Sequence, residues 1–87
     1  MENIEETVLN LHTKLMYEQG IKQQSSPELE LRPRNGITSS TIVSLILDIE
    51  DVLNIQLDNY IYEIRKCKTI SDFILIIETA FSDFRGA

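Results

Sequence analysis

The sequence has little of what self-contained catalysis or metal binding requires. Its 87 residues include one histidine, His12, and one cysteine, Cys67, which excludes a cluster of His and Cys metal ligands and an internal disulfide. A catalytic serine needs a base that a third group orients, and His12 has no acid at a suitable spacing. The three glycines form no phosphate-binding loop. We therefore expect no enzymatic activity and no metal site, and a structural role for His12.

Long hydrophobic runs are also missing. No apolar stretch is long enough to span a bilayer, and the first residues show no signal-peptide pattern. A single cysteine is typical of proteins in a reducing compartment. Because 87 residues leave no room for a second core, we expect one domain over residues 1–87. We also expect the protein to be cytoplasmic and monomeric.

Positive charge is scarce in the middle of the chain. The sequence carries 14 acidic and 8 basic residues, which give a net charge of −6, and it has no Lys or Arg from Thr38 to Glu63. This balance disfavours nucleic acid and anionic membranes as partners and favours basic protein surfaces. A run of acids is also usual on a solvated helix face, so the charge pattern leaves both interpretations open.

Apolar residues at a helical spacing predict an all-α protein, a small four-helix bundle with a short third helix and a long first loop. The predicted helices are Asn3 to Gln19, Thr38 or Ser39 to Leu53, Asn59 to Arg65 and Thr69 to Phe84. The loop from Ile21 to Asn35 contains both prolines and has no periodicity. Such a long loop should be held to the core by apolar anchors, here Ile21, Leu29 and Leu31.

Polar residues near the helix ends predict how the helices begin and stop. The expected capping pairs are Asn3 with Glu6 and Thr69 with Asp72. Gly20 suits a left-handed helix end, and Asp58 is expected to cap the third helix. In the first loop, Ser26 and Pro27 could begin a single helical turn.

The stretch from Gly36 to Leu53 is the one around which we expect the chain to be organised. Gly36 should reverse the chain, and Thr38 or Ser39 should cap the helix that follows. A phosphate ester on Ser39 would meet the free N–H groups and the positive end of the dipole at the start of this helix. A hydroxyl residue here is also a common helix cap, so the local pattern leaves both roles open. The predicted core-facing stripe is Ile42, Leu45, Ile46, Ile49 and Leu53.

The segment Gly36-Ile37-Thr38-Ser39-Ser40 resembles the acyl carrier protein family, in which a G-x-D-S-L motif opens the second helix. The matching positions after it are Val43, Leu45, Ile46, Ile49, Glu50, Leu53 and Leu57. Thr69-Ile70-Ser71-Asp72-Phe73 is similar to the start of the family's fourth helix, and the likeness covers nearly the whole chain. The spacing from Gly36 identifies the family's serine with Ser39, because Ser40 would shift the apolar register by one residue.

The resemblance implies a covalently attached cofactor. In the family, a separate transferase with Mg²⁺ attaches 4'-phosphopantetheine from coenzyme A to the serine, and the thiol of this arm carries acyl or aminoacyl groups as thioesters. The arm would here be attached to Ser39 and serve fatty-acid, polyketide or peptide-type biosynthesis, with its acyl chain sheltered between helices. The transferase and acyl-processing enzymes would dock through basic surfaces. The docking residues so implied are Thr38, Ser40, Ser44, Asp48, Glu50 and Asp51.

Two positions depart from the family motif. Thr38 stands where the motif has an acid that could help the metal and arginine contacts of the transferase, and Ser40 replaces a leucine that anchors partners. The alternative is therefore an unmodified carrier-like module, a docking or structural subunit in which Thr38 and Ser39 only cap a helix. A third possibility, an enzyme using His12 and Ser39, requires these side chains to lie within hydrogen-bonding distance.

Overall fold

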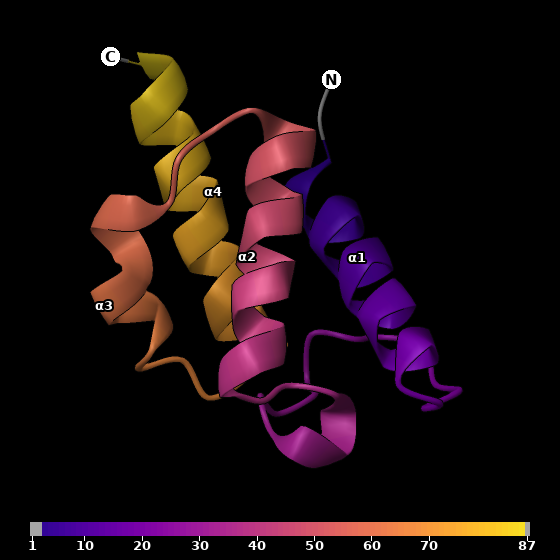
Figure 1. Ribbon diagram of the computed structural model, residues 1–87. Helices are drawn as coiled ribbons and strands as arrows, with labels where there is room; N and C mark the ends of the chain where they lie inside the picture. Colours follow the sequence, from indigo (N-terminus) through magenta and orange to yellow (C-terminus); the bar gives the residue numbers. More distant parts are fainter. Residues whose placement is uncertain (1–2, 87) are drawn as a thin grey trace.

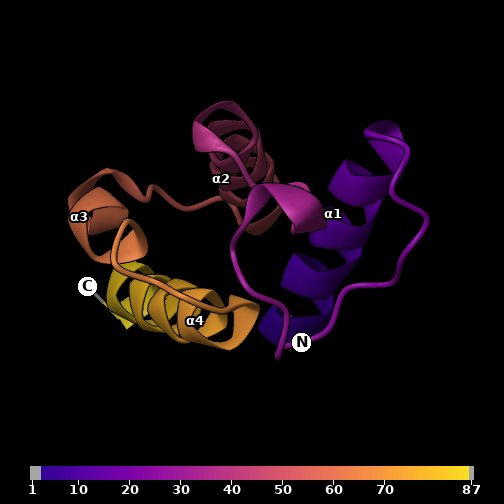
Figure 2. The same cartoon turned by 90° about the horizontal axis from the view of Figure 1, so that it is seen from below.

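The computed structural model describes residues 3–86, and over this range it is helical without strands. Its elements in chain order are α1 (Ile4–Glu18), the 3₁₀ helix η1 (Pro33–Asn35), α2 (Ser39–Leu53), the 3₁₀ helix η2 (Asp58–Tyr60), α3 (Ile61–Ile64) and α4 (Ile70–Gly86). Successive α-helices run in opposite directions (Figure 1). Seen along the bundle, α2 lies opposite α4, with α1 on one side and α3 on the other (Figure 2). The predicted four-helix fold with a short third helix is confirmed.

Both ends of α1 form as the sequence predicts. Asn3 Oδ1 accepts the N–H of Glu6 at 3.0 Å, which satisfies one of the free donors of the first turn. At the other end Gly20 adopts a left-handed φ of 83°. Its N–H bonds to the carbonyl of Tyr17, and the N–H of Ile21 bonds to the carbonyl of Met16. This pair of bonds is a Schellman motif, which ends the helix and turns the chain into the long loop.

The start of α4 also carries the predicted capping box. Thr69 Oγ1 accepts the N–H of Asp72, and Asp72 Oδ2 accepts the N–H groups of Thr69 and Lys68. These bonds to backbone N–H groups lower the pKa of Asp72, because they stabilise its ionised form. The carboxylate therefore fastens the helix start at neutral pH.

The long first loop is fastened to the same end of α4 by backbone hydrogen bonds. Leu31 donates to the carbonyl of Lys68, while Leu29 and Pro27 accept from Ile70 and Ser71. Leu29 and Leu31 are partly buried against the core, as predicted for anchors. Ile21, the third predicted anchor, is partly buried but does not pack against the core cluster. The segment before α2 is thereby held beside the start of α4, although it contains only one turn of regular structure.

One local prediction is wrong, and a second is met by an isolated turn only. Asp58 makes no capping bond, because η2 begins at Asp58 itself and its N-cap position is Leu57. The expected helical turn at Ser26 is a single hydrogen-bonded turn, Leu29 N–H to Ser26 O at 3.2 Å. Regular structure in the loop forms instead at η1, which begins with Pro33, a residue whose fixed φ suits a first helical position.

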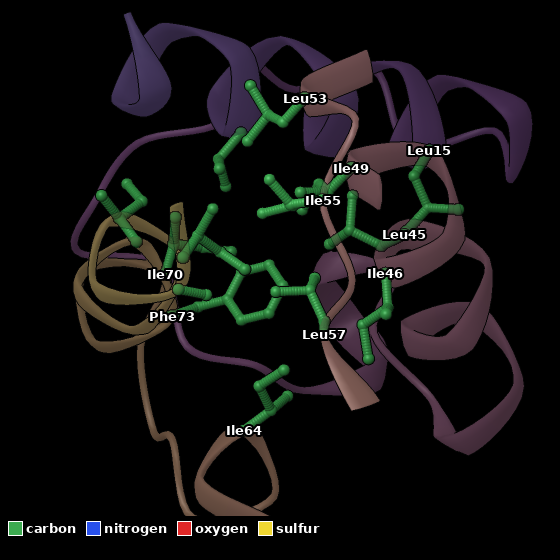
Figure 3. Close-up of a cluster of buried hydrophobic side chains, with 14 of the residues drawn as sticks. Leu15, Leu45, Ile46, Ile49, Leu53, Ile55, Leu57, Ile64, Ile70 and Phe73 are labelled. Atoms are coloured by element: carbon green, nitrogen blue, oxygen red, sulfur yellow. The ribbon is translucent and has the colours of Figure 1, made fainter. Parts of the chain in front are cut away.

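The core is an apolar cluster to which all four helices contribute, and Phe73 of α4 lies at its centre (Figure 3). The predicted core-facing stripe of α2 is buried or partly buried along its whole length. Met16 of α1 is fully buried. Ile55 and Leu57, from the connection after α2, also enter the core. None of the helices described in residues 3–86 has the length and apolar character needed to cross a membrane.

Candidate functional site

The chain turns into α2 at Gly36, whose role lies within the molecule. Its φ is 79°, a left-handed conformation that favours glycine. A Cβ atom at this position would come within 2.8 Å of Gln19 Nε2 and 3.2 Å of Met16 Cγ. Gln19 Nε2 also donates to the Gly36 carbonyl at 2.9 Å. Gly36 therefore lets the turn pack closely against the end of α1, which fixes where α2 begins.

Thr38, and not Ser39, caps α2. Thr38 Oγ1 accepts the N–H of Thr41 at 3.1 Å, and Thr41 Oγ1 accepts the N–H of Thr38 at 2.7 Å. Thr41 Oγ1 also donates to the Gly36 carbonyl at 2.6 Å. This reciprocal capping box satisfies two free backbone donors at the helix start. Of the two caps that the sequence allowed, Thr38 or Ser39, Thr38 is therefore the one that forms.

Ser39 is the first residue of α2, and its side chain is exposed. Among the side chains described, those of residues 3–84, none forms a hydrogen bond with its hydroxyl, and the same holds for the exposed hydroxyl of Ser40. The two serines differ in what they face. Ser39 lines a groove between α2 and α3, whereas Ser40 does not contribute to it. The structure therefore distinguishes the two hydroxyls by their position relative to this groove.

The groove has a volume of about 580 Å³ and an apolar lining. It lies between the first half of α2, the end of α3 and the segment that leads into α2. Its lining residues are Leu31, Pro33, Ile37, Thr38, Ser39, Ile42, Val43, Ile46, Ile61, Ile64, Arg65 and Cys67. The volume is within the range of small-molecule sites, which are also mostly apolar with a few polar groups.

Cys67 is a free thiol in this lining. Burial, with a smaller contribution from the charge of Asp72, raises the pKa of the thiol to about 11. Its Sγ atom lies 3.6 Å from the Glu63 carbonyl oxygen, which the S–H group faces as a donor. The thiol is therefore protonated at neutral pH and is a poor nucleophile.

The outward face of α2 carries the remaining residues implied as docking contacts. Ser40, Ser44, Asp48 and Asp51 are exposed and follow one another at helical spacing. Val43 and Leu47 lie beside them with about half of their side-chain surface exposed, 52% and 57%. The face is thus both acidic and apolar.

Glu50 differs from the other acids of α2. It is half-buried, and its Oε2 atom accepts the N–H of Leu57 at 2.7 Å. Its carboxylate therefore holds the connection to η2 in place, a role that the sequence pattern did not reveal. Spacing alone could not have found this bond, because it joins a helix side chain to an irregular segment.

His12 lies apart from Ser39 and is built into the structure, as expected. Its side chain is buried, with Nε2 2.8 Å from the Asn35 carbonyl oxygen and Nδ1 2.6 Å from Ser25 Oγ. A carbonyl oxygen can only accept, so Nε2 carries the proton and Nδ1 accepts from the Ser25 hydroxyl. Burial lowers the pKa of His12, which keeps the ring neutral. Because both ring nitrogens are occupied, His12 and Ser39 do not form a nucleophile–base pair.

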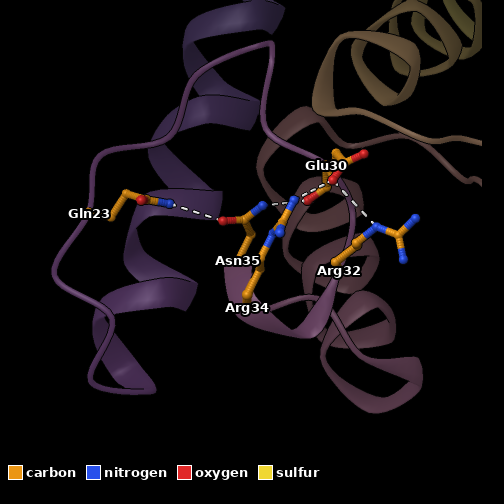
Figure 4. A network of polar contacts seen from close by, with 5 residues as sticks. All are labelled: Gln23, Glu30, Arg32, Arg34 and Asn35. Atoms are coloured by element: carbon orange, nitrogen blue, oxygen red, sulfur yellow. Dashed lines mark hydrogen bonds and ion pairs between the residues drawn. The ribbon is translucent and has the colours of Figure 1, made fainter.

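A polar network shapes the last residues before Gly36 (Figure 4). Glu30 forms ion pairs with Arg34 and with Arg32, the latter at 3.4 Å. Asn35 Nδ2 donates to the Glu30 carbonyl at 2.8 Å, and Gln23 Nε2 donates to Asn35 Oδ1 at 3.2 Å. The charges of Arg32 and Arg34 are therefore balanced in part by Glu30.

Comparisons with models of protein families, with curated proteins and with solved structures found no match. In the described part of the chain, no group of three or more His, Cys, Asp or Glu side chains is arranged to hold a metal ion. Ser39, the groove beside it and the acidic face of α2 are therefore the candidate functional features of the chain.

Proposed function

We propose that this protein is an acyl carrier that presents Ser39 for attachment of 4'-phosphopantetheine. One observation carries the proposal: the Ser39 hydroxyl is exposed at the first turn of α2, takes no part in the cap and opens onto an apolar groove. A hydroxyl that must be esterified by another protein has to be accessible and free of internal bonds. The order and lengths of the helices agree with this function, as does the acidic face of α2.

The residues around Ser39 fit such an arm. A phosphodiester on Ser39 would lie at the start of α2, where the helix dipole favours negative charge. The arm itself would supply a thiol that carries acyl or aminoacyl groups as thioesters. The groove offers an apolar surface to a carried chain, and the Cys67 thiol is protonated at neutral pH and so is a poor nucleophile toward a thioester. Asp48 and Asp51, with Val43 and Leu47, would meet basic partner enzymes in fatty-acid, polyketide or peptide-type biosynthesis.

An unmodified docking module is the second candidate. The exposed Val43 and Leu47 beside exposed acids favour it, because a mixed apolar and charged face can bind a protein without any prosthetic group. In that case the groove and the Ser39 hydroxyl would have no role in function. The two candidates therefore differ in whether Ser39 accepts the arm.

The test is incubation of the purified chain with coenzyme A, Mg²⁺ and a transferase of broad specificity, followed by intact mass spectrometry. We expect a gain of one phosphopantetheine group in the wild type and in Ser40→Ala, and no gain in Ser39→Ala. Ser40→Ala is a matched control, because Ser40 is also exposed and free but does not line the groove. An unchanged wild-type mass, or a modified Ser39→Ala variant, would contradict the proposal and favour the docking module.

A further inference from the structure

The groove beside Ser39 contains one charged side chain. Arg65, at the end of α3, lines it together with apolar residues of α2 and α3. Arg65 is exposed and forms no ion pair with any residue from 3 to 86. This sets it apart from Arg32 and Arg34 on the neighbouring segment, which both pair with Glu30. An unpaired guanidinium at an apolar groove suits a ligand that is apolar along its length and carries an anion.

Arginine is well suited to bind one particular anion. Its planar guanidinium presents a rigid set of donors that matches both oxygens of a carboxylate. The groove has no Lys or second Arg and so lacks the additional cations that would favour a more highly charged group. Asp and Glu are also missing from the lining, so no acid of the groove competes for Arg65.

We propose that the groove binds an acyl chain with a terminal carboxylate, carried on the arm of Ser39, and that Arg65 pairs with this carboxylate. The inference depends on the proposed carrier function and adds the class of cargo. The apolar lining would contact the methylene groups of the chain, while Arg65 would select a dicarboxylic chain over a neutral one. Arg65 acts here by binding the cargo and takes no part in attaching the arm.

The test compares two acyl groups of equal carbon number on the same arm. The protein is loaded from hexanedioyl-coenzyme A or from hexanoyl-coenzyme A. The carried group then ends in a carboxylate in the first case and in a methyl group in the second. The rate at which hydroxylamine cleaves each thioester is followed by intact mass and divided by the rate of the same thioester on free pantetheine. A group that stays in the groove is protected, so this ratio measures its occupancy without any partner enzyme.

We expect the hexanedioyl group to be protected about two- to five-fold more in the wild type than in Arg65→Gln, the range of an exposed ion pair. Arg65→Lys should keep part of the difference, and Arg65→Gln should leave hexanoyl protection unchanged. The matched control is Lys66→Gln, which removes the next cation along the chain, one that lies over the Tyr62 ring and outside the groove lining. This control should behave as the wild type does.

Two results would overturn the inference: equal protection of the two groups in the wild type, or a hexanedioyl advantage that survives Arg65→Gln. Neither result affects the carrier function, since both require a loaded arm. Failure to load either group from its coenzyme A ester would instead contradict the carrier function itself, and the cargo assignment with it.

Discussion

Replacing Thr38 by alanine should destabilise the protein, whereas replacing Ser39 by alanine should not, although the two residues are adjacent and both carry a hydroxyl. Thr38→Ala removes the oxygen that accepts the Thr41 N–H at the start of α2. Loss of such a cap destabilises a protein by about 1 kcal/mol, within a range of roughly 0.5–2 kcal/mol. Ser39→Ala removes no described hydrogen bond and places a better helix former in the first turn, so its free energy of unfolding should stay within about 0.5 kcal/mol of the wild type.

Urea denaturation followed by circular dichroism measures this difference. With a denaturant slope of about 1 kcal/mol per M for a small domain, Thr38→Ala should lower the midpoint by about 1 M. Ser39→Ala should leave the midpoint nearly unchanged. Thr38→Asp serves as the control, because aspartate also caps and its charge suits a helix N-terminus. If Ser39→Ala were as destabilising as Thr38→Ala, the argument that the Ser39 hydroxyl is free would be refuted.

Three further predictions concern the core and the titratable groups. Because the pKa of His12 is lowered in the folded state, its contribution to stability is complete above about pH 6.5 and is lost as the pH falls through the folded pKa. The urea midpoint should therefore decline as the pH is lowered from 7.5 to 5.5, and it should decline less in His12→Gln. Phe73→Ala should lower the free energy of unfolding by about 3–5 kcal/mol, whereas truncation of the exposed Leu75 should change it by less than about 1 kcal/mol, both measured by urea denaturation. With a pKa of about 11, Cys67 should react with iodoacetamide at pH 8 about 10-fold more slowly than an ordinary cysteine; an equal rate would contradict its burial in the groove.

The features that the sequence predicted correctly depend on local chemistry. The cap at Asn3, the left-handed Gly20 and the box of Thr69 with Asp72 each involve residues within a few positions of one another. Helical spacing likewise identified the faces that enter the core. In these cases the interacting groups are close along the chain, so their pattern can be read without knowing the fold.

The features that the sequence did not reveal depend on contacts between a helix and a segment outside it. Met16 is fully buried because the turn at Gly36 packs over it, with only 3.2 Å between Met16 Cγ and a Cβ placed at Gly36. Glu50 was interpreted as a surface acid, but its carboxylate binds the N–H of Leu57. The hydrogen bond between His12 and Ser25 was also not predicted, since 13 positions of the chain separate the two residues.

The candidate site was predicted in part. Sequence register favoured Ser39 over Ser40, and the structure adds that only Ser39 faces the groove. The groove itself joins α2, α3 and the first loop, and no helical periodicity could place Arg65 or Cys67 in its lining. The arm and its cargo stay predictions.

Localisation of the attached group within the chain tests the central claim most directly. No Lys or Arg occurs between Arg34 and Arg65, so trypsin releases residues 35–65 as one peptide that contains Ser39, Ser40 and Ser44. Fragmentation of this peptide after treatment with coenzyme A and the transferase assigns the modified residue. The account predicts phosphopantetheine on Ser39 alone. An unmodified peptide, or the group on Ser40 or Ser44, would contradict it.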